Sequence, residues 1–172
     1  PERRAAVSRR FPGERIVVPA GPLKVRSNDT GYRFRAHSAF IHLTGLETES
    51  EPDALLVFGP NDTAEAAASS AAVSPDAAGH TVTLWFRPRA GADTEEFFSD
   101  ARYGEYWVGP RDDLETMSVR TGIRTADSST ALDSVTKDLG SVSVRVVRGA
   151  DQALEQAIDA ARAQASADQE TA

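Results

Sequence analysis

Short apolar runs separated by polar turns recur along the chain and predict the strands of a buried sheet. RIVVP (Arg15–Pro19) and ALLVF (Ala54–Phe58) are mostly apolar and too short for helices, which is typical of interior strands. TVTLWFR (Thr81–Arg87) has the same character and is followed by a proline. Further extended segments are expected at 23–27, 32–35, 39–44, 123–125 and 142–147.

Helices are predicted between these strands from capping residues and stop signals. Thr94 can cap a helix that runs toward Tyr103 and ends at Gly104, because its hydroxyl accepts from free backbone N–H groups. Asp112 or Asp113 can cap the next helix in the same way. The expected helices are 2–11, 94–103, a segment through Arg120, 128–139 and a terminal helix capped by Asp151. Strands interleaved with helices predict an α/β fold, a three-layer α/β/α domain around a mixed central sheet.

Two segments lack such patterns. Residues 61–80 are rich in Ala, Ser and Asp and are expected to be a surface insertion, with a solvated His80 at its end. The tail from Gln164 is polar and alanine-rich, the composition of a linker. Because the sequence starts at Pro1 rather than a methionine, we expect it to be a fragment of a longer protein.

Charge and composition narrow the function classes. Residues 1–46 carry nine Lys or Arg against three Asp or Glu, whereas the whole chain has a net charge of −7. The arginines are scattered over several elements, so nucleic acid is not an expected partner. No run is long enough for a membrane span, so no membrane partner is expected either. The chain has no cysteine, which excludes disulfides and thiolate metal sites and agrees with a cytoplasmic location.

The stretch from Leu23 to Leu46 holds the most specific chemistry. Asn28 to Gly31 has turn composition, since short polar side chains bond their own backbone and glycine accepts a positive φ. Three arginines flank Asp29 in sequence, so the turn could present a carboxylate and guanidinium groups to a charged ligand such as a peptide terminus. His37 and His42 would point to opposite faces of a strand and are interpreted as packing residues rather than metal ligands. The flanking arginines are Arg26, Arg33 and Arg35.

The second half offers weaker candidates. Glu95 and Glu96 could pair for acid–base chemistry, but their place at a helix start explains them sufficiently. Phe97 and Phe98 would face about 100° apart on a helix, so both cannot be core residues and one is expected to face a partner. The segment 107–110 (WVGP) is interpreted as a packing turn. Without a nucleophile and base, a phosphate loop or zinc spacing, the residues alone indicate a non-catalytic α/β domain.

The run FPGERIVVPAGPLKVRSNDTGYRFRAHSAFIHLTGL (11–46) resembles the N-terminal domain of the Xaa-Pro aminopeptidases, or aminopeptidase P, of the creatinase/prolidase family. The resemblance continues in EPDALLVF (51–58), TLWFRPR (83–89), DTEEFF (93–98) and RYGEYWVGP (102–110). It implies the aminopeptidase P N-terminal fold, with its ribonuclease H-like motif, over residues 1–150. Residues 151–172 would then be a terminal helix and linker toward a catalytic domain that is missing here.

What the resemblance implies is a two-part bacterial metallopeptidase that removes the residue before a proline. The catalytic domain of this family binds two divalent metals, usually manganese, through Asp, His and Glu side chains that activate a water. No histidine follows His80, so this chain is expected to hold no catalytic residue, cofactor or metal and to be inactive alone. Its implied partners are its own catalytic domain, neighbouring subunits of a homo-oligomer, and a peptide with proline at the second position.

The resemblance also implies roles for named residues. Asp29 would lie near the amino terminus of the substrate, in an active site belonging to another domain or subunit. Phe98 stands where relatives can carry a tryptophan lining the pocket, and keeps the aromatic wall without the indole N–H donor. Arg33 and Arg35 would form ion pairs at a domain or subunit interface. The alternative is a stand-alone peptide- or protein-binding module, like the peptidase-like domains of histone chaperones; a nuclease is disfavoured because the strands hold no carboxylate cluster.

Overall fold

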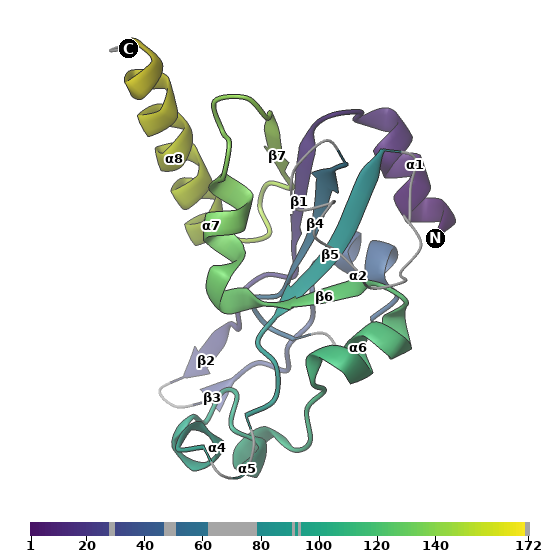
Figure 1. Ribbon diagram of the computed structural model, residues 1–172. Helices are drawn as coiled ribbons and strands as arrows, with labels where there is room; N and C mark the ends of the chain where they lie inside the picture. Colours follow the sequence, from purple (N-terminus) through teal and green to yellow (C-terminus); the bar gives the residue numbers. More distant parts are fainter. Residues whose placement is uncertain (28–29, 47–50, 62–78, 91, 93, 171–172) are drawn as a thin grey trace.

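A five-stranded mixed sheet forms the centre of the domain, as a computed structural model shows for residues 1–27, 30–46, 51–61, 79–90, 92 and 94–170 (Figure 1). The strand order is β6-β5-β4-β1-β7. Strand β4 runs antiparallel to both of its neighbours, β1 and β5. Each edge strand is parallel to the strand beside it, β7 to β1 and β6 to β5. The strands are β1 (Arg15–Pro19), β4 (Leu55–Pro60), β5 (His80–Phe86), β6 (Arg124–Asp127) and β7 (Val144–Val146).

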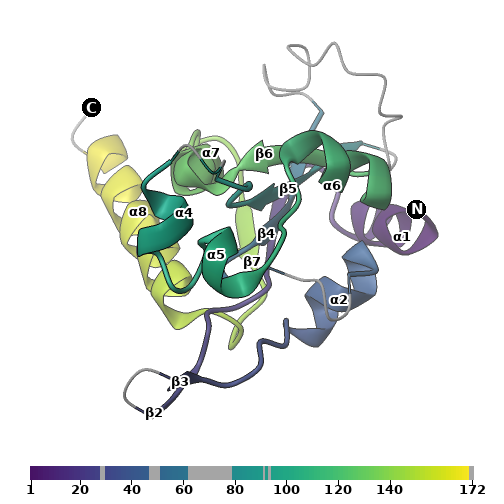
Figure 2. The same ribbon diagram turned by 90° about the horizontal axis from the view of Figure 1, so that it is seen from below.

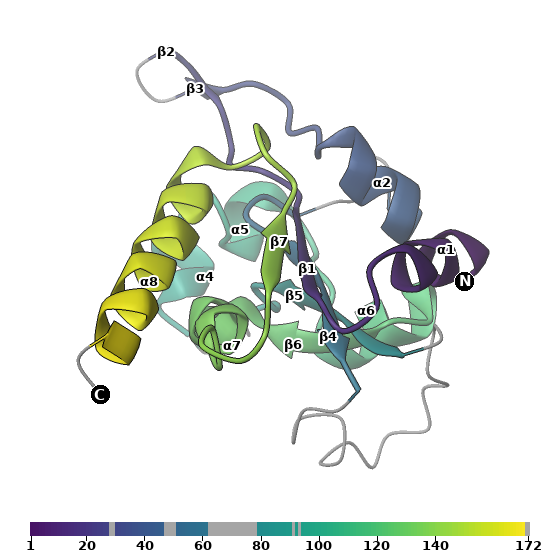
Figure 3. The same ribbon diagram turned by 90° about the horizontal axis from the view of Figure 1, so that it is seen from above.

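Helices cover both faces of this sheet, and the predicted three-layer α/β/α fold is confirmed (Figure 3). Alternate strand residues point to opposite faces, so Ile16 and Val18 pack in one core while Val17, between them, packs in the other. Helices α1 (Glu2–Arg10), α2 (Ser38–Thr44) and α6 (Leu114–Thr121) cover the first face, and η1 (Ser128–Thr130), α7 (Ala131–Thr136) and α8 (Gln152–Glu170) belong to the second.

Two irregular regions extend from one end of the sheet. One is the hairpin of β2 (Val25–Ser27) and β3 (Thr30–Gly31). The other contains the one-turn helices α4 (Glu96–Ser99) and α5 (Glu105–Val108). Seen from below, α4 and α5 lie across the end of the sheet while the hairpin projects to one side (Figure 2). Among the described residues, no helix is both long and apolar enough to cross a bilayer.

Several predicted elements are confirmed. Strand β1 has the predicted bounds, and β4 and β5 agree within two residues at each end. Helix α6 begins after Asp113, whose carboxylate accepts from Thr116 N at 2.7 Å. Asp151 likewise accepts from Leu154 N at 3.0 Å and caps α8. The proposed surface insertion lies mostly outside the described residues.

Other predictions are wrong for local reasons. Residues 39–44 are helical rather than extended: Phe40 and Thr44, four residues apart, are buried on one face of α2. The His37 side chain caps this helix by accepting from Ala39 N at 3.3 Å, and His42 is exposed, so neither packs in the core. Tyr32 to Arg35 has no strand partner among the described residues. The predicted helix 128–139 ends early, as η1 followed by α7.

The prediction of a solvated His80 is also wrong, and the tail is helical. His80 is fully buried at the start of β5, and its Nε2 lies 2.8 Å from the carbonyl oxygen of Glu14. The tail from Gln164, which has linker composition, continues α8 as a regular helix to Glu170. Alanine favours helix strongly, so the same composition suits either structure once Leu154 and Ile158 attach the helix to the sheet.

Candidate functional site

Helices α4 and α5 present a continuous aromatic surface to solvent. Its members are Phe98, Tyr106 and Trp107, whose exposed fractions are 57%, 63% and 59%. The ring centroids of Phe98 and Tyr106 are 5.7 Å apart, and those of Tyr106 and Trp107 are 5.2 Å apart. Trp107 Nε1 donates to the carbonyl oxygen of Phe98 at 2.7 Å and ties α5 to α4. Contiguous exposed aromatic side chains are typical of interaction sites.

The predicted helix 94–103 is reduced to α4, while α5 lies beyond the predicted range; α4 is stopped by Asp100. Its carboxylate oxygen Oδ1 accepts from Arg102 N at 2.9 Å and from Tyr103 N at 3.2 Å, and its backbone is extended. Such side-chain bonds compete with helix continuation. The N-cap is Glu95 rather than Thr94, and its side chain makes no capping bond. The break turns α5 back against α4.

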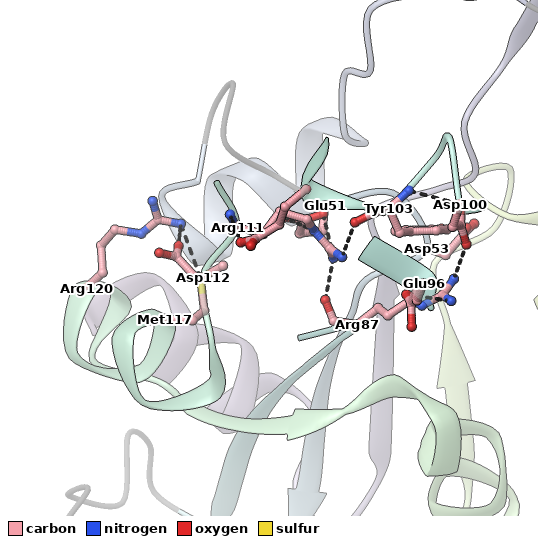
Figure 4. Close-up of polar contacts among 11 residues, drawn as sticks. Glu51, Asp53, Arg87, Glu96, Asp100, Tyr103, Arg111, Asp112, Met117 and Arg120 are labelled. Atoms are coloured by element: carbon pink, nitrogen blue, oxygen red, sulfur yellow. Dashed lines mark hydrogen bonds and ion pairs between the residues drawn. The ribbon is translucent and has the colours of Figure 1, made fainter. Parts of the chain in front are cut away.

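A buried arginine anchors this region to the end of the sheet (Figure 4). Arg111 is only 9% exposed, and its Nε and Nη2 donate to the two carboxylate oxygens of Glu51 at 3.4 and 3.1 Å. Its Nη1 donates to Tyr103 O at 3.0 Å, and its Nη2 also donates to Arg87 O. One guanidinium therefore joins the segment before β4, the end of β5 and the α4–α5 connection.

Tyr103 forms the second part of the anchor. Its hydroxyl donates to Asp53 Oδ2 at 2.5 Å, and its ring lies under two guanidinium groups, Arg87 at 4.5 Å and Arg111 at 5.3 Å. Arg87 also pairs with Glu96 at 2.7 Å and with Asp100 at 3.2 Å. We call Glu51, Asp53, Arg87, Tyr103 and Arg111 the anchoring cluster. Burial, followed by the hydrogen bond to Asp53, raises the pKa of Tyr103 well above its ordinary value.

Replacing Tyr103 by phenylalanine tests this bond. We expect Tyr103→Phe to lower the free energy of unfolding by about 1–2 kcal/mol at neutral pH, because Asp53 loses a buried donor. A raised folded-state pKa stabilises the fold fully below the ordinary tyrosine pKa of 10.0 and progressively less above it. The difference between wild type and variant should therefore shrink above pH 10 in urea titrations. A difference that grows with pH in that range would contradict the assignment.

An open groove of about 510 Å³ lies beside the anchoring cluster. Leu23 and Phe34, which flank the β2–β3 hairpin, form one side, and Ala101, Arg102 and Val108 of the α4–α5 region form another. The groove therefore separates the two regions in which the sequence places its candidate substrate contacts.

The predicted site residues fall in different places. Phe98 belongs to the aromatic surface, and Phe97 is half-buried, so the prediction that they are not both core residues and that one is exposed is confirmed. Arg33 and Arg35 are exposed on the irregular segment before α2, whereas Phe34 between them faces the groove. Asp29 lies outside the described residues.

Sequence reasoning missed the anchoring cluster and misplaced Trp107. The segment 107–110 is not a packing turn, because Trp107 and Val108 are both about half exposed. The buried Arg111 had no signal in the local sequence, since its partner Glu51 is 60 residues away. The resemblance itself was the available pointer, because its motif 102–110 contains Tyr103 and Trp107.

No group of three or more His, Cys, Asp or Glu side chains among the described residues is arranged to hold a metal. The two divalent metals that the family resemblance implies therefore do not fit the part of the chain that the structure describes. The carboxylates of the anchoring cluster are already engaged by Arg111 and Tyr103.

Comparisons with known proteins agree on one family. The family model described as "Aminopeptidase P, N-terminal domain" matches residues 1–147. Xaa-Pro aminopeptidase 1 of Streptomyces coelicolor is 41% identical over 156 residues, covering 91% of this chain and 28% of the relative. Xaa-Pro aminopeptidase 2 of the same organism is 41% identical over 159 residues, covering 91% of this chain and 29% of the relative. The chain thus spans less than a third of the length of these curated relatives.

Solved structures agree in fold. The low-pH form of Escherichia coli aminopeptidase P superposes with a TM-score of 0.66 at 22% identity, covering 94% of this chain and 31% of that one. A zinc-substituted form of the same Escherichia coli enzyme, in complex with product, gives 0.67 at 22% identity, with coverages of 93% and 31%. At this identity the structures establish a shared fold.

Proposed function

The chain belongs to the aminopeptidase P N-terminal domain family, and we propose that it shapes the mouth of the active site of a Xaa-Pro aminopeptidase without carrying catalytic residues. In this proposal the catalytic domain lies in the rest of the protein, where two metals, manganese in the usual family pattern, would be bound. Residues 1–150 would form the N-terminal domain, and residues 151–172, which include the whole of α8, would lead toward the catalytic domain.

The observation that carries this proposal is the aromatic surface on a rigid support. Three aromatic rings are more than half exposed, so covering them with a partner or a ligand would be favourable because it removes apolar surface from water. The anchoring cluster holds α4 and α5 through a buried arginine and a buried tyrosine, which keeps the surface in one position. A fixed aromatic wall suits a role in limiting which peptides enter a nearby active site.

Two residues would contact the substrate in trans. Phe98 would form the wall, and Asp29 would oppose the positively charged amino terminus of the peptide. Arg33 and Arg35 are exposed cations before α2, and we assign them to ion pairs with another domain or subunit of a homo-oligomer. The aromatic surface and these arginines together give the domain an oligomerising as well as a substrate-restricting role.

The experiment is a peptide-length series on the full-length protein that carries this domain. We expect Asp29→Ala to lower kcat/KM on longer peptides by about tenfold, because it removes one charge-assisted contact. Phe98→Ala should weaken discrimination between short and long peptides. The metal content of both variants should equal that of wild type, since neither residue would hold metal.

Val119→Ala serves as the control, because Val119 is 80% exposed on α6, outside the aromatic surface. Its kinetics should equal those of wild type at every peptide length. Unchanged length dependence in both Asp29→Ala and Phe98→Ala would overturn the proposed function.

A further inference from the structure

The groove beside the anchoring cluster has walls of mixed apolar and charged residues drawn from distant parts of the chain. They come from the flanks of the β2–β3 hairpin, the segment before β4 and the α4–α5 region. The apolar lining residues are Leu23, Phe34, Pro52, Ala101, Val108 and Pro110. A volume of about 510 Å³ is within the range of small-ligand sites, which is roughly 300–1,000 Å³. The apolar residues of the lining can accept an apolar side chain.

Two of the three arginines that line the groove are paired with carboxylates, and the third is Arg102. Arg111 is neutralised by Glu51 at 3.1 Å, and Arg120 is neutralised by Asp112 at 2.6 Å. Arg102 also lines the groove and its side chain is exposed. Its backbone N donates to Asp100, but its guanidinium makes no hydrogen bond or ion pair with any residue that the structure describes. Counting only the described residues, the groove therefore carries one positive charge without an ion-pair partner, beside the apolar residues of its lining.

We propose that this groove binds the carboxyl-terminal residue of a short peptide substrate, with Arg102 pairing with the free carboxylate. A guanidinium matches a carboxylate with two parallel N–H···O bonds, and the apolar residues of the lining receive the terminal side chain. The proposal rests on the proposed function, because Ala101 and Arg102 follow the C-cap of α4, the helix that carries Phe98. A peptide held against Phe98 thus needs only a few residues to reach Arg102. Arg102 becomes a specificity-determining residue for short peptides with an apolar end.

The test compares free acids with amides on the full-length protein. The substrates are tripeptides and tetrapeptides with proline second and leucine last, each as the carboxylate and as the carboxamide. Wild type should show a KM about fivefold lower for the acids, as expected for one partly exposed ion pair. Arg102→Gln should abolish this difference by raising KM for the acids, with kcat unchanged, and Arg102→Lys should restore part of it.

The matched control is Arg10→Gln, because Arg10 is an exposed arginine on α1, at the other end of the domain from α4 and α5 (Figure 1). It should keep the preference for acids. Equal KM values for acid and amide in wild type, or a preference that survives Arg102→Gln, would overturn this inference. The peptide-length series with Phe98→Ala separates the two proposals. If Phe98→Ala weakens length discrimination as expected while the KM values of acids and amides are equal, the proposed function stands and only the groove assignment fails.

Discussion

Replacing Arg111 by methionine is expected to lower the free energy of unfolding of the domain by about 3–5 kcal/mol. Methionine fills much of the volume but donates no hydrogen bonds. The Glu51 carboxylate then loses its bidentate partner, and the carbonyl oxygens of Tyr103 and Arg87 lose a buried donor. Leaving a partly buried carboxylate unpaired costs far more than the net contribution of the intact pair. Urea denaturation followed by tryptophan fluorescence measures the loss.

Two companion variants make the Arg111 result interpretable. Arg120→Met removes an ion pair with Asp112 in which both side chains are partly exposed, and should cost less than about 1 kcal/mol. The double variant Glu51→Met with Arg111→Met removes both charges. Its loss of unfolding free energy should therefore be about 2 kcal/mol smaller than the sum of the losses in the two single variants. Additive losses, or equal losses for Arg111→Met and Arg120→Met, would show that Arg111 does not anchor the α4–α5 region.

The sheet was predictable because its signal is local. The apolar runs in β1 and β4 are buried on both faces, which leaves little room for another structure. The segment 39–44 failed for the opposite reason: a short run with Phe40 and Ile41 side by side fits a strand or a buried helix equally well. His37 caps α2, a role that the packing interpretation had not given it.

The candidate site was only partly predictable. Helix geometry predicted that one of Phe97 and Phe98 is exposed, since neighbouring residues cannot share one face, but it did not select Phe98. The anchoring cluster that holds α4 and Phe98 in place could not be predicted from the sequence pattern. Its bonds from Arg111 to Glu51 and from Tyr103 to Asp53 join residues that are 60 and 50 positions apart. The prediction of a solvated His80 was wrong for the same reason, since its hydrogen-bond partner Glu14 is 66 positions away. Periodicity carries no information about such pairs, whereas a family resemblance does.

The second large effect is expected from Gly104→Ala. Gly104 has φ −66° and ψ 126°, a conformation that alanine adopts freely, so backbone strain is not the cause. The cause is steric: a Cβ atom at Gly104 would lie 2.6 Å from the carbonyl oxygens of Glu96 and Phe97 and 2.7 Å from that of Asp100. All three atoms are backbone atoms of α4 or its cap and cannot move aside as a side chain would. We expect a loss of about 3 kcal/mol in unfolding free energy, with α4 pushed away from α5.

The displacement of α4 is what distinguishes Gly104→Ala from simple destabilisation. Trp107 Nε1 donates to Phe98 O across the gap that the new methyl group would open, so this bond should break. In a Trp85→Phe background the emission of Trp107 should therefore shift before any unfolding. Gly59→Ala is the matched control, since its Cβ would meet Thr81 O at an ordinary 3.8 Å and should change stability by less than about 1 kcal/mol. Wild-type emission together with wild-type stability in Gly104→Ala would mean that α4 does not rest on Gly104, and the rigid support proposed for Phe98 would be lost with it.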